Sequence, residues 1–206
     1  MCVYILYVCT DFHRLFDMNY HAPTEDKFNT MYTIQMYDAQ ADSIIIEDIA
    51  ANENNRVMLN RMKRNKPEDI DQLYIQNEHD EDGEACEDYV PEGTNDMGWL
   101  GYFIGMNKQL TGLNLTSFTP TSGASVTEVL EPFFMGLKYN KSIRQLNFAD
   151  MDLFGGKMFT MMGPFFENCP TLADLTVSGS HLGDDGWRLL ALAIGSSSSK
   201  SLRKVY

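Results

Sequence analysis

The sequence predicts an α/β fold built as a solenoid, in which strand–turn–helix units stack side by side. Two observations predict this fold. An apolar hexad recurs along the chain, and an apolar pattern with the period of a helix follows it in successive units. Because one such unit cannot bury its apolar face alone, the units must stack on their neighbours.

The hexad carries apolar residues at its first, fourth and sixth positions. It occurs at Ile70, Leu73 and Ile75; Leu110, Leu113 and Leu115; Ile143, Leu146 and Phe148; Leu172, Leu175 and Val177; and Leu202 and Val205. The first positions lie 40, 33, 29 and 30 residues apart. The alternation at the end of each hexad indicates a half-buried strand. The last hexad stops before its third apolar position, so we expect an incomplete C-terminal repeat.

Helical spacing of apolar residues follows the hexads. It involves Trp99, Leu100, Phe103 and Ile104; Val126, Val129, Leu130 and Phe133; Met158, Met161, Met162 and Phe165; and Trp187, Leu190, Ala191 and Ile194. Residues 52–64 are predicted as a further helix, with Val57, Leu59 and Met62 partly on one side. Asn65, Asn107, Asn140 and Asn168 precede hexads, and we expect them to end helices in the left-handed conformation.

A doubly wound α/β sheet is the alternative fold, because it also alternates strands and helices. The nearly fixed period and the repeated hexad favour the solenoid. Residues 1–39 carry no repeat and are expected to form an N-terminal leader or cap, with the repeat domain over residues 40–206.

An acidic insertion over residues 77–97 accounts for the long first spacing. Nine acidic residues and no Lys or Arg lie between Glu78 and Asp96, and without these nine the net charge of −13 would be −4. Carboxylates could bind calcium, but the spacing after Asp82 departs from that of an EF-hand loop. We therefore expect a solvated loop.

The segment from Leu172 to Ile194 resembles one unit of the ribonuclease-inhibitor-like leucine-rich repeat family, and the resemblance extends over about residues 70–206. It implies a horseshoe segment with parallel strands on the concave face and helices on the convex face. It also implies an intracellular, non-catalytic protein-binding scaffold. The family often has Asn or Cys eight residues after the first leucine. This chain has Glu78, Phe118, Met151 and Ser180 there, so no side-chain ladder is expected at that turn.

No catalytic motif occurs in the sequence, and the four histidines are isolated. His79 with Cys86 gives too few ligands for a zinc site. We therefore expect no enzyme activity, no cofactor and no metal. An acidic chain is a poor candidate for binding nucleic acid or an anionic membrane. The four scattered cysteines favour a reducing compartment, so we expect a cytoplasmic location.

The strand positions between the apolar residues are the candidate binding residues, because they face away from the core. They are Gln72, Tyr74, Gln76, Asn114, Thr116, Gln145, Asn147, Asp174, Thr176 and Lys204. We expect them to bind a partner protein, with Tyr74 as an anchor. The alternative is a structural fragment of a longer repeat protein with no binding activity of its own. Self-association through the incomplete last repeat is also expected, because it would expose a strand edge.

Overall fold

In a computed structural model of the chain, the structure describes residues 34–66, 70–77, 88–151, 157–179, 191, 195 and 203–205. They belong to one compact unit that runs from Ile34 to Tyr206. The described residues do not include segment 1–33 or the acidic residues 78–87. Of the helix predicted over 187–194, only residue 191 is described, and it is helical. Residues 34–40 are also helical; Ile34 is buried in the core, and the ring of Tyr37 lies 4.7 Å from that of Trp99.

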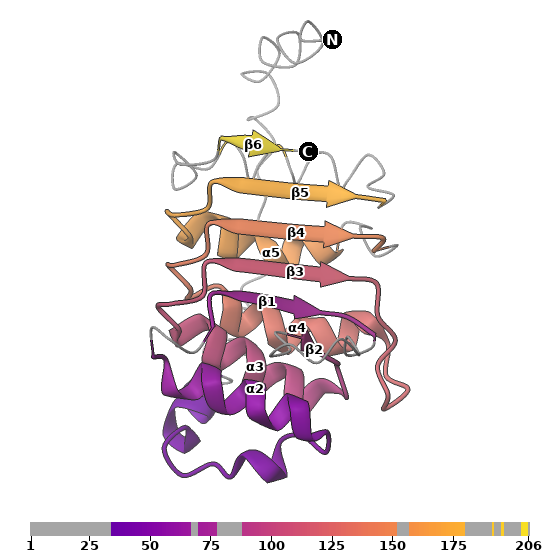
Figure 1. The fold of residues 1–206 in the computed structure, drawn as a ribbon. Helices are drawn as coiled ribbons and strands as arrows, with labels where there is room; N and C mark the ends of the chain where they lie inside the picture. The colour runs from indigo at the N-terminus through magenta and orange to yellow at the C-terminus, as the bar shows by residue number, and fades with distance from the viewer. Residues whose placement is uncertain are drawn as a thin grey trace, which may run out of the picture. The chain divides into compact units, whose positions relative to one another are not determined.

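The fold is α/β with one parallel sheet, which confirms the predicted class. The strands are β1 (Gln72–Ile75), β2 (Asp88–Tyr89), β3 (Gly112–Thr116), β4 (Gln145–Ala149), β5 (Asp174–Ser178) and β6 (Lys204–Val205). They lie in the order β2-β1-β3-β4-β5-β6, and every pair is parallel. Figure 1 shows the strands stacked as rungs in chain order, with β2 alone displaced to the outside of β1.

The apolar residues of the hexads align across the strands. Leu73, Leu113, Leu146 and Leu175 are register partners in neighbouring strands, and each is at most 1% exposed. The first hexad positions, Ile70, Leu110, Ile143 and Leu172, are buried as well. The prediction that the hexads form strands with their apolar residues in the core is therefore confirmed for these four units, except that Val177 is only partly buried.

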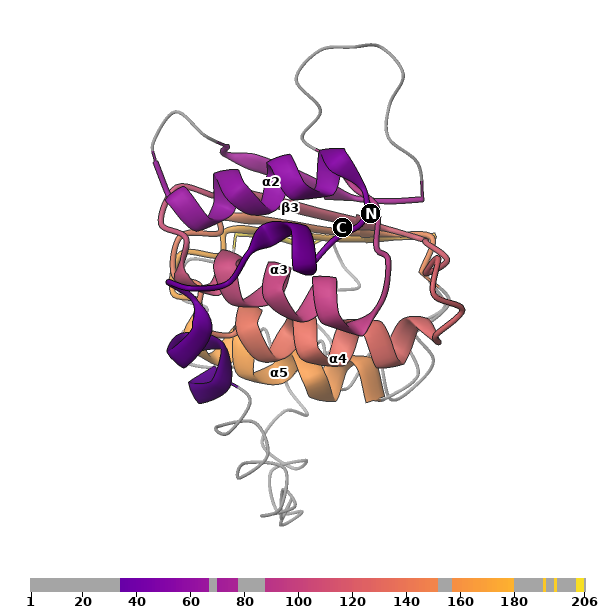
Figure 2. The same cartoon turned by 90° about the horizontal axis from the view of Figure 1, so that it is seen from below.

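Four long helices accompany the sheet: α2 (Glu53–Arg64), α3 (Thr94–Met106), α4 (Val126–Leu137) and α5 (Lys157–Asn168). Helices α3, α4 and α5 lie on one face of the sheet, and α2 lies along its edge beside β2 (Figures 1 and 2). A doubly wound sheet carries helices on both faces, whereas the described helices α3, α4 and α5 share one face. The prediction for α2 is right in extent but wrong for Val57, which is 52% exposed while Met58 is buried.

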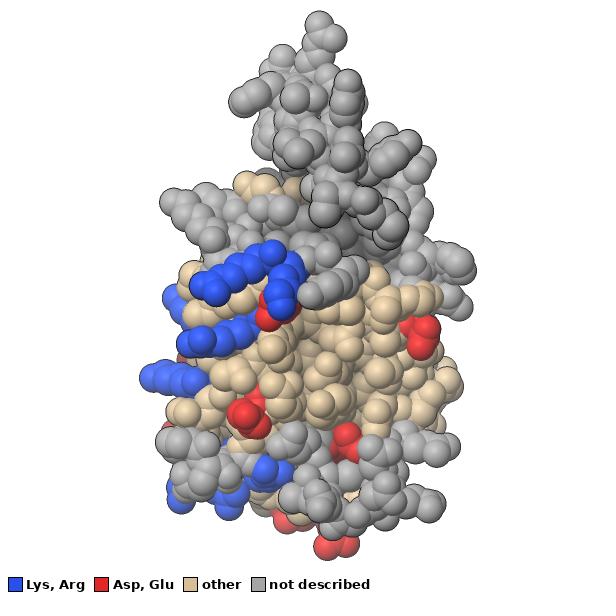
Figure 3. All heavy atoms as spheres, turned by 45° about the horizontal axis from the view of Figure 1, so that its top comes forward, with Lys and Arg blue, Asp and Glu red and all other residues tan. Residues whose placement is uncertain are grey.

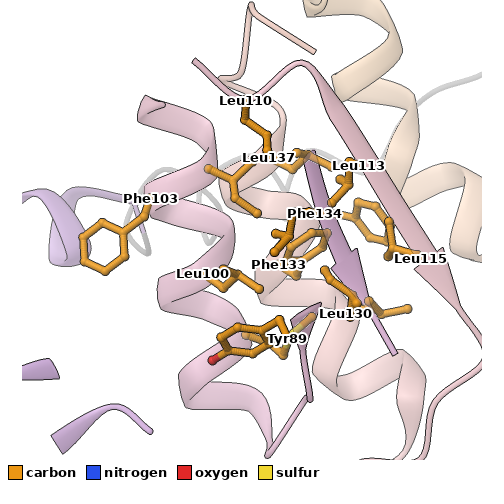
Figure 4. Close-up of a cluster of buried hydrophobic side chains, with 14 of the residues drawn as sticks. Tyr89, Leu100, Phe103, Leu110, Leu113, Leu115, Leu130, Phe133, Phe134 and Leu137 are labelled. Atoms are coloured by element: carbon orange, nitrogen blue, oxygen red, sulfur yellow. The ribbon is translucent and has the colours of Figure 1, made fainter. Parts of the chain in front are cut away.

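Helices α3 and α4 approach each other closely through glycines. A methyl group at Gly101 would overlap the backbone of Phe133, and one at Gly136 would overlap the backbone of Gly101. Phe133 and Phe134, beside this contact, belong to the same buried cluster as Leu113 and Leu115 of β3 (Figure 4). Because these glycines have no side chain, the backbones of α3 and α4 can pack directly against each other.

Asparagines at the helix-to-strand connections form a ladder between units, and the expectation of left-handed helix ends is only partly right. Asn65 is left-handed, with φ 52°. Asn107 is extended, and neither Asn140 nor Asn168 has a positive φ. Asn140 Oδ1 accepts from the backbone N–H groups of its own connection, and Nδ2 donates to the carbonyls of Ile104 (2.7 Å) and Asn107 (3.1 Å). Asn107 Nδ2 donates in the same way to the carbonyl of Met62 (3.4 Å).

Cys169 takes the next place in this ladder. Its thiol is buried and donates to the Ile143 carbonyl across 3.4 Å, and burial raises its pKa. No ladder was expected at the turn after each strand, and this ladder is at the opposite edge, before each strand. Because each rung bonds to the carbonyls of the preceding unit, it fixes the units in a common register.

The described end of the acidic insertion is not a solvated loop, which corrects the prediction for residues 88–97. Tyr89 is fully buried in β2, and its hydroxyl donates to Asp96 Oδ2 across 3.1 Å. Asp96 also accepts from the N–H groups of Glu92 and Gly93. Glu92 accepts from the backbone N–H groups of Ala51 and Asn52, just before α2. These carboxylates stabilise helix starts, where the helix dipole favours negative charge.

Candidate functional site

The predicted binding residues come together on the face of the sheet that α3, α4 and α5 leave uncovered. We call this the open face and define it by Gln72, Tyr74, Asn114, Thr116, Gln145, Asn147, Asp174, Thr176 and Lys204. All nine are half-buried or exposed, in contrast to the buried leucines between them. Gln76 lies just beyond β1, where its backbone N–H donates to the carbonyl of Tyr89.

Strand register arranges eight of these residues in two rows across the sheet, and Thr116 lies beyond them, with Ala149 as its register partner. The first row runs Gln72, Gly112, Gln145, Asp174, Lys204, and the second runs Tyr74, Asn114, Asn147, Thr176. Neighbouring strands lie about 4.8 Å apart, so each row is a continuous line of side chains. The rows expose mostly amides and hydroxyls, which hydrogen-bond in either direction or donate several bonds at once.

Tyr74 and Gly112 shape one side of the open face. Tyr74 is 39% exposed and is the one large apolar side chain of the two rows; its register partners are Asp88 and Asn114. Gly112 was not predicted as part of the face. The amide of Gln72 lies over it, in the space that a side chain at position 112 would need.

Asn147 lies at the centre of the open face and has an unusual environment. Its Oδ1 is buried and receives no hydrogen bond from the residues that the structure describes. Its register partners on either side are Asn114 and Thr176. A buried carbonyl oxygen without a donor costs about 1–3 kcal/mol, and most such groups in proteins are satisfied. Thr116, in contrast, donates its hydroxyl to the carbonyl of Ile75 across 3.3 Å.

Charge is distributed unevenly around the open face. Figure 3 shows a mostly uncharged surface, with Lys and Arg side chains gathered along the edge where the strands begin. We call Arg144, Arg203 and Lys204 the basic border; all three are exposed and lie at the starts of β4 and β6. Arg144 and Arg203 were missed because strand alternation does not select the residue before a strand.

A small hollow lies behind this edge, at the ends of α4 and α5. It has a volume of about 300 Å³ and is lined by Lys138, Tyr139, Lys141 and Asn168. Lys138 Nζ lies 5.1 Å from the centre of the Tyr139 ring, and partial burial lowers the pKa of this lysine. The hollow therefore adds cationic character to the same edge.

The metal and membrane predictions concern residues that are only partly described. His79 and Cys86 lie outside the described residues, as does most of the acidic stretch. Among the residues that are described, no cluster of three His, Cys, Asp or Glu side chains could hold a metal ion. None of the described helices is long and apolar enough to cross a membrane.

Comparison of the chain with models of protein families and with curated proteins gives no match.

Proposed function

We propose that this chain is a ribonuclease-inhibitor-like leucine-rich repeat solenoid that binds a partner protein through its open face. Support for the solenoid comes from β1, β3, β4, β5 and β6, which follow chain order in one register, with β2 on the outer side of β1. It also comes from α3, α4 and α5, which lie on one face, and from the asparagine ladder between units. Repeat proteins of this kind offer an extended strand face to their partners.

Asn147 carries the proposal of a binding surface. Its Oδ1 lacks a donor at the centre of a polar, mostly uncharged face. A rotation of the amide would bring this acceptor to an N–H group of a bound protein, and the hydrogen bond would offset the loss of hydration. Gln145 and Thr176 flank it with further polar groups, and Tyr74 offers an aromatic contact.

The chemistry of these residues supports a scaffold and not a catalyst. Amides, hydroxyls and a tyrosine form hydrogen bonds, but they do not exchange protons readily near neutral pH. The buried thiol of Cys169 suits a reducing environment, so we propose that the partner is met in the cytoplasm.

The test compares the proteins that the purified chain retains from a cell extract before and after a change of the open face. The variant is Gln145→Ala with Asn147→Leu, which removes hydrogen-bonding groups without changing the charge. The matched control is Gln35→Ala with Asn60→Leu, because both of these residues are exposed on helices. Circular dichroism melting of each variant verifies that it is folded.

The proposal predicts that at least one protein is retained by wild type and by the control variant but lost from the open-face variant. Retention of the same proteins by all three chains would contradict binding through this face. If the control variant also fails to retain the protein, the protein contacts the helices and not the open face alone.

A further inference from the structure

We infer that the partner segment that occupies the open face is acidic, and that its carboxylates contact the basic border. This inference rests on the proposed function, since it names the chemistry of the ligand for the same face. It runs against the net charge of −13, which by itself favours a basic partner.

The first observation is the distribution of cations along the chain. Ten of the sixteen Lys and Arg residues lie in the last turn of a described helix, between such a helix and the next strand, or at the start of β6, namely within 61–72, 106–112, 138–145 and 203–204. In the described sheet, all of the strand starts lie at one edge, since every strand is parallel. An acidic protein therefore carries a positive edge beside its open face.

The second observation is that the basic border does not serve the helices. A cation directly after a helix is favoured by the helix dipole, and Lys138 has this position after α4. Arg144 and Arg203 lie further along, with their backbone N–H groups bonded to the carbonyls of Thr111 and Ala173 in neighbouring connections. Their side chains are exposed, and neither forms an ion pair with any described residue.

The third observation is the geometry of the border. Arg144 and Arg203 precede β4 and β6, which lie on either side of β5, so their backbones are about 10 Å apart. Arg144 adjoins Gln145, and Lys204 ends the first row of the open face. A segment lying across β4, β5 and β6 can thus place carboxylates on the border while its backbone bonds to Gln145 and Asn147. Asp174, in the same row, is the one carboxylate there.

Carboxylates of a protein suit this surface better than the phosphates of a nucleic acid. Three cations at one edge attract a few acidic side chains within a screening length of about 8 Å at physiological salt. A polyphosphate carries charge along its whole length, so the remaining negative charge of the chain would repel it.

The experiment measures fluorescence anisotropy of labelled peptides of about 12 residues that alternate Glu with Ser, Gln with Ser, or Lys with Ser. Binding is measured at about 50 mM salt and again at about 300 mM, where surface charges are screened. The border variant is Arg144→Gln with Lys204→Gln. The control is Arg64→Gln with Lys66→Gln, which removes the same charge from two exposed cations at the end of α2.

The Glu peptide is expected to bind wild type and the control alike, to bind the border variant about tenfold more weakly, and to lose affinity at high salt. Equal behaviour of wild type and border variant, including no binding to either, would overturn the inference. Tighter binding of the Lys peptide, or of a single-stranded DNA of similar length, would overturn it too. If instead the chain shows a doubled mass at low salt and the border variant a single mass, the basic border binds a second copy of the chain, and the inference is overturned.

The two proposals can fail separately. The experiment with the cell extract tests the open face alone, because Gln145→Ala and Asn147→Leu do not change the charge of the chain and the partner need not be charged. If the open-face variant loses the partner while the border variant keeps it, the acidic ligand is wrong and the proposed function stands.

Discussion

Two asparagines of this chain have the same side chain and opposite roles. Asn140 is fully buried and uses both ends of its amide within the fold. Asn147, seven residues later, lies on the open face with its Oδ1 unbonded. The hydrogen bonds of Asn140 stabilise the stack of units, whereas the amide of Asn147 contributes little to the fold and is available to a ligand.

Replacement of Asn140 by Ala should lower the free energy of unfolding by about 2–4 kcal/mol, because it leaves several buried backbone groups without partners. Urea unfolding followed by circular dichroism measures this change. Asn60→Ala, at an exposed position in α2, is the control and should change stability by about 0.5 kcal/mol or less. A loss at Asn140 no larger than that of the control would contradict the structural role of the ladder.

Asn147→Leu should leave the free energy of unfolding unchanged or raise it by up to about 1 kcal/mol. The substitution removes an acceptor that has no donor and replaces it with an apolar group of similar volume. The same urea experiment applies, and the same variant should weaken retention of the partner. Destabilisation as large as that of Asn140→Ala would mean that the Asn147 amide is satisfied within the fold.

Asp96 gives the fold a pH dependence. Burial raises the pKa of this carboxyl above its usual 3.8, although its hydrogen bonds act in the opposite direction. The folded state therefore binds the proton more tightly than the unfolded state, so the contribution of Asp96 to stability grows as pH falls from neutral through the raised pKa.

We predict that wild type becomes more stable relative to Asp96→Asn as the pH is lowered from about 7 to about 4, since the amide cannot titrate. Urea unfolding of both proteins at several pH values measures the difference. A constant difference over this range, or one that shrinks at lower pH, would show that the folded-state pKa of Asp96 is not raised.

Among the elements, the α3–α4 pair depends on small residues. Gly101→Ala and Gly136→Ala should each lower the free energy of unfolding by about 1–3 kcal/mol, because the added methyl overlaps backbone and the helices must move apart. Gly163→Ala in α5 is the matched control, since a Cβ there meets nothing within 4 Å. It should be neutral or stabilising by up to about 1 kcal/mol, because Ala favours a helix over Gly.

Thermal melts of these three variants rank them directly. Similar melting temperatures for Gly101→Ala and Gly163→Ala would contradict the close approach of α3 and α4.

The sequence predicts strongly periodic elements well and isolated ones poorly. The strands β1, β3, β4 and β5 and the helices α2 to α5 have apolar patterns of many residues, and their places agree with the prediction. Strand β2 is only two residues long, too short for any periodicity, and its Tyr89 is buried because it pairs with β1. The side chains of Asn107 and Asn140 bond to carbonyls of the preceding unit. The sequence pattern within one unit cannot predict such contacts between units.

At the scale of the whole molecule, the alternation of apolar and polar residues along the strands was sufficient to predict the nine residues of the open face. It was not sufficient to find the basic border, because Arg144 and Arg203 stand before their strands and become neighbours of the face only when the strands align in parallel. The charge pattern therefore follows from topology, and the net charge of the chain does not reveal it.

Site-specific photo-crosslinking tests most directly whether a partner protein contacts the open face. A photoreactive phenylalanine analogue is placed at Tyr74, which is 39% exposed on the open face, or at Val57, which is 52% exposed on α2. We predict that the protein retained by the chain is crosslinked from position 74 and not from position 57. Crosslinking from position 57 without crosslinking from position 74 would contradict the account.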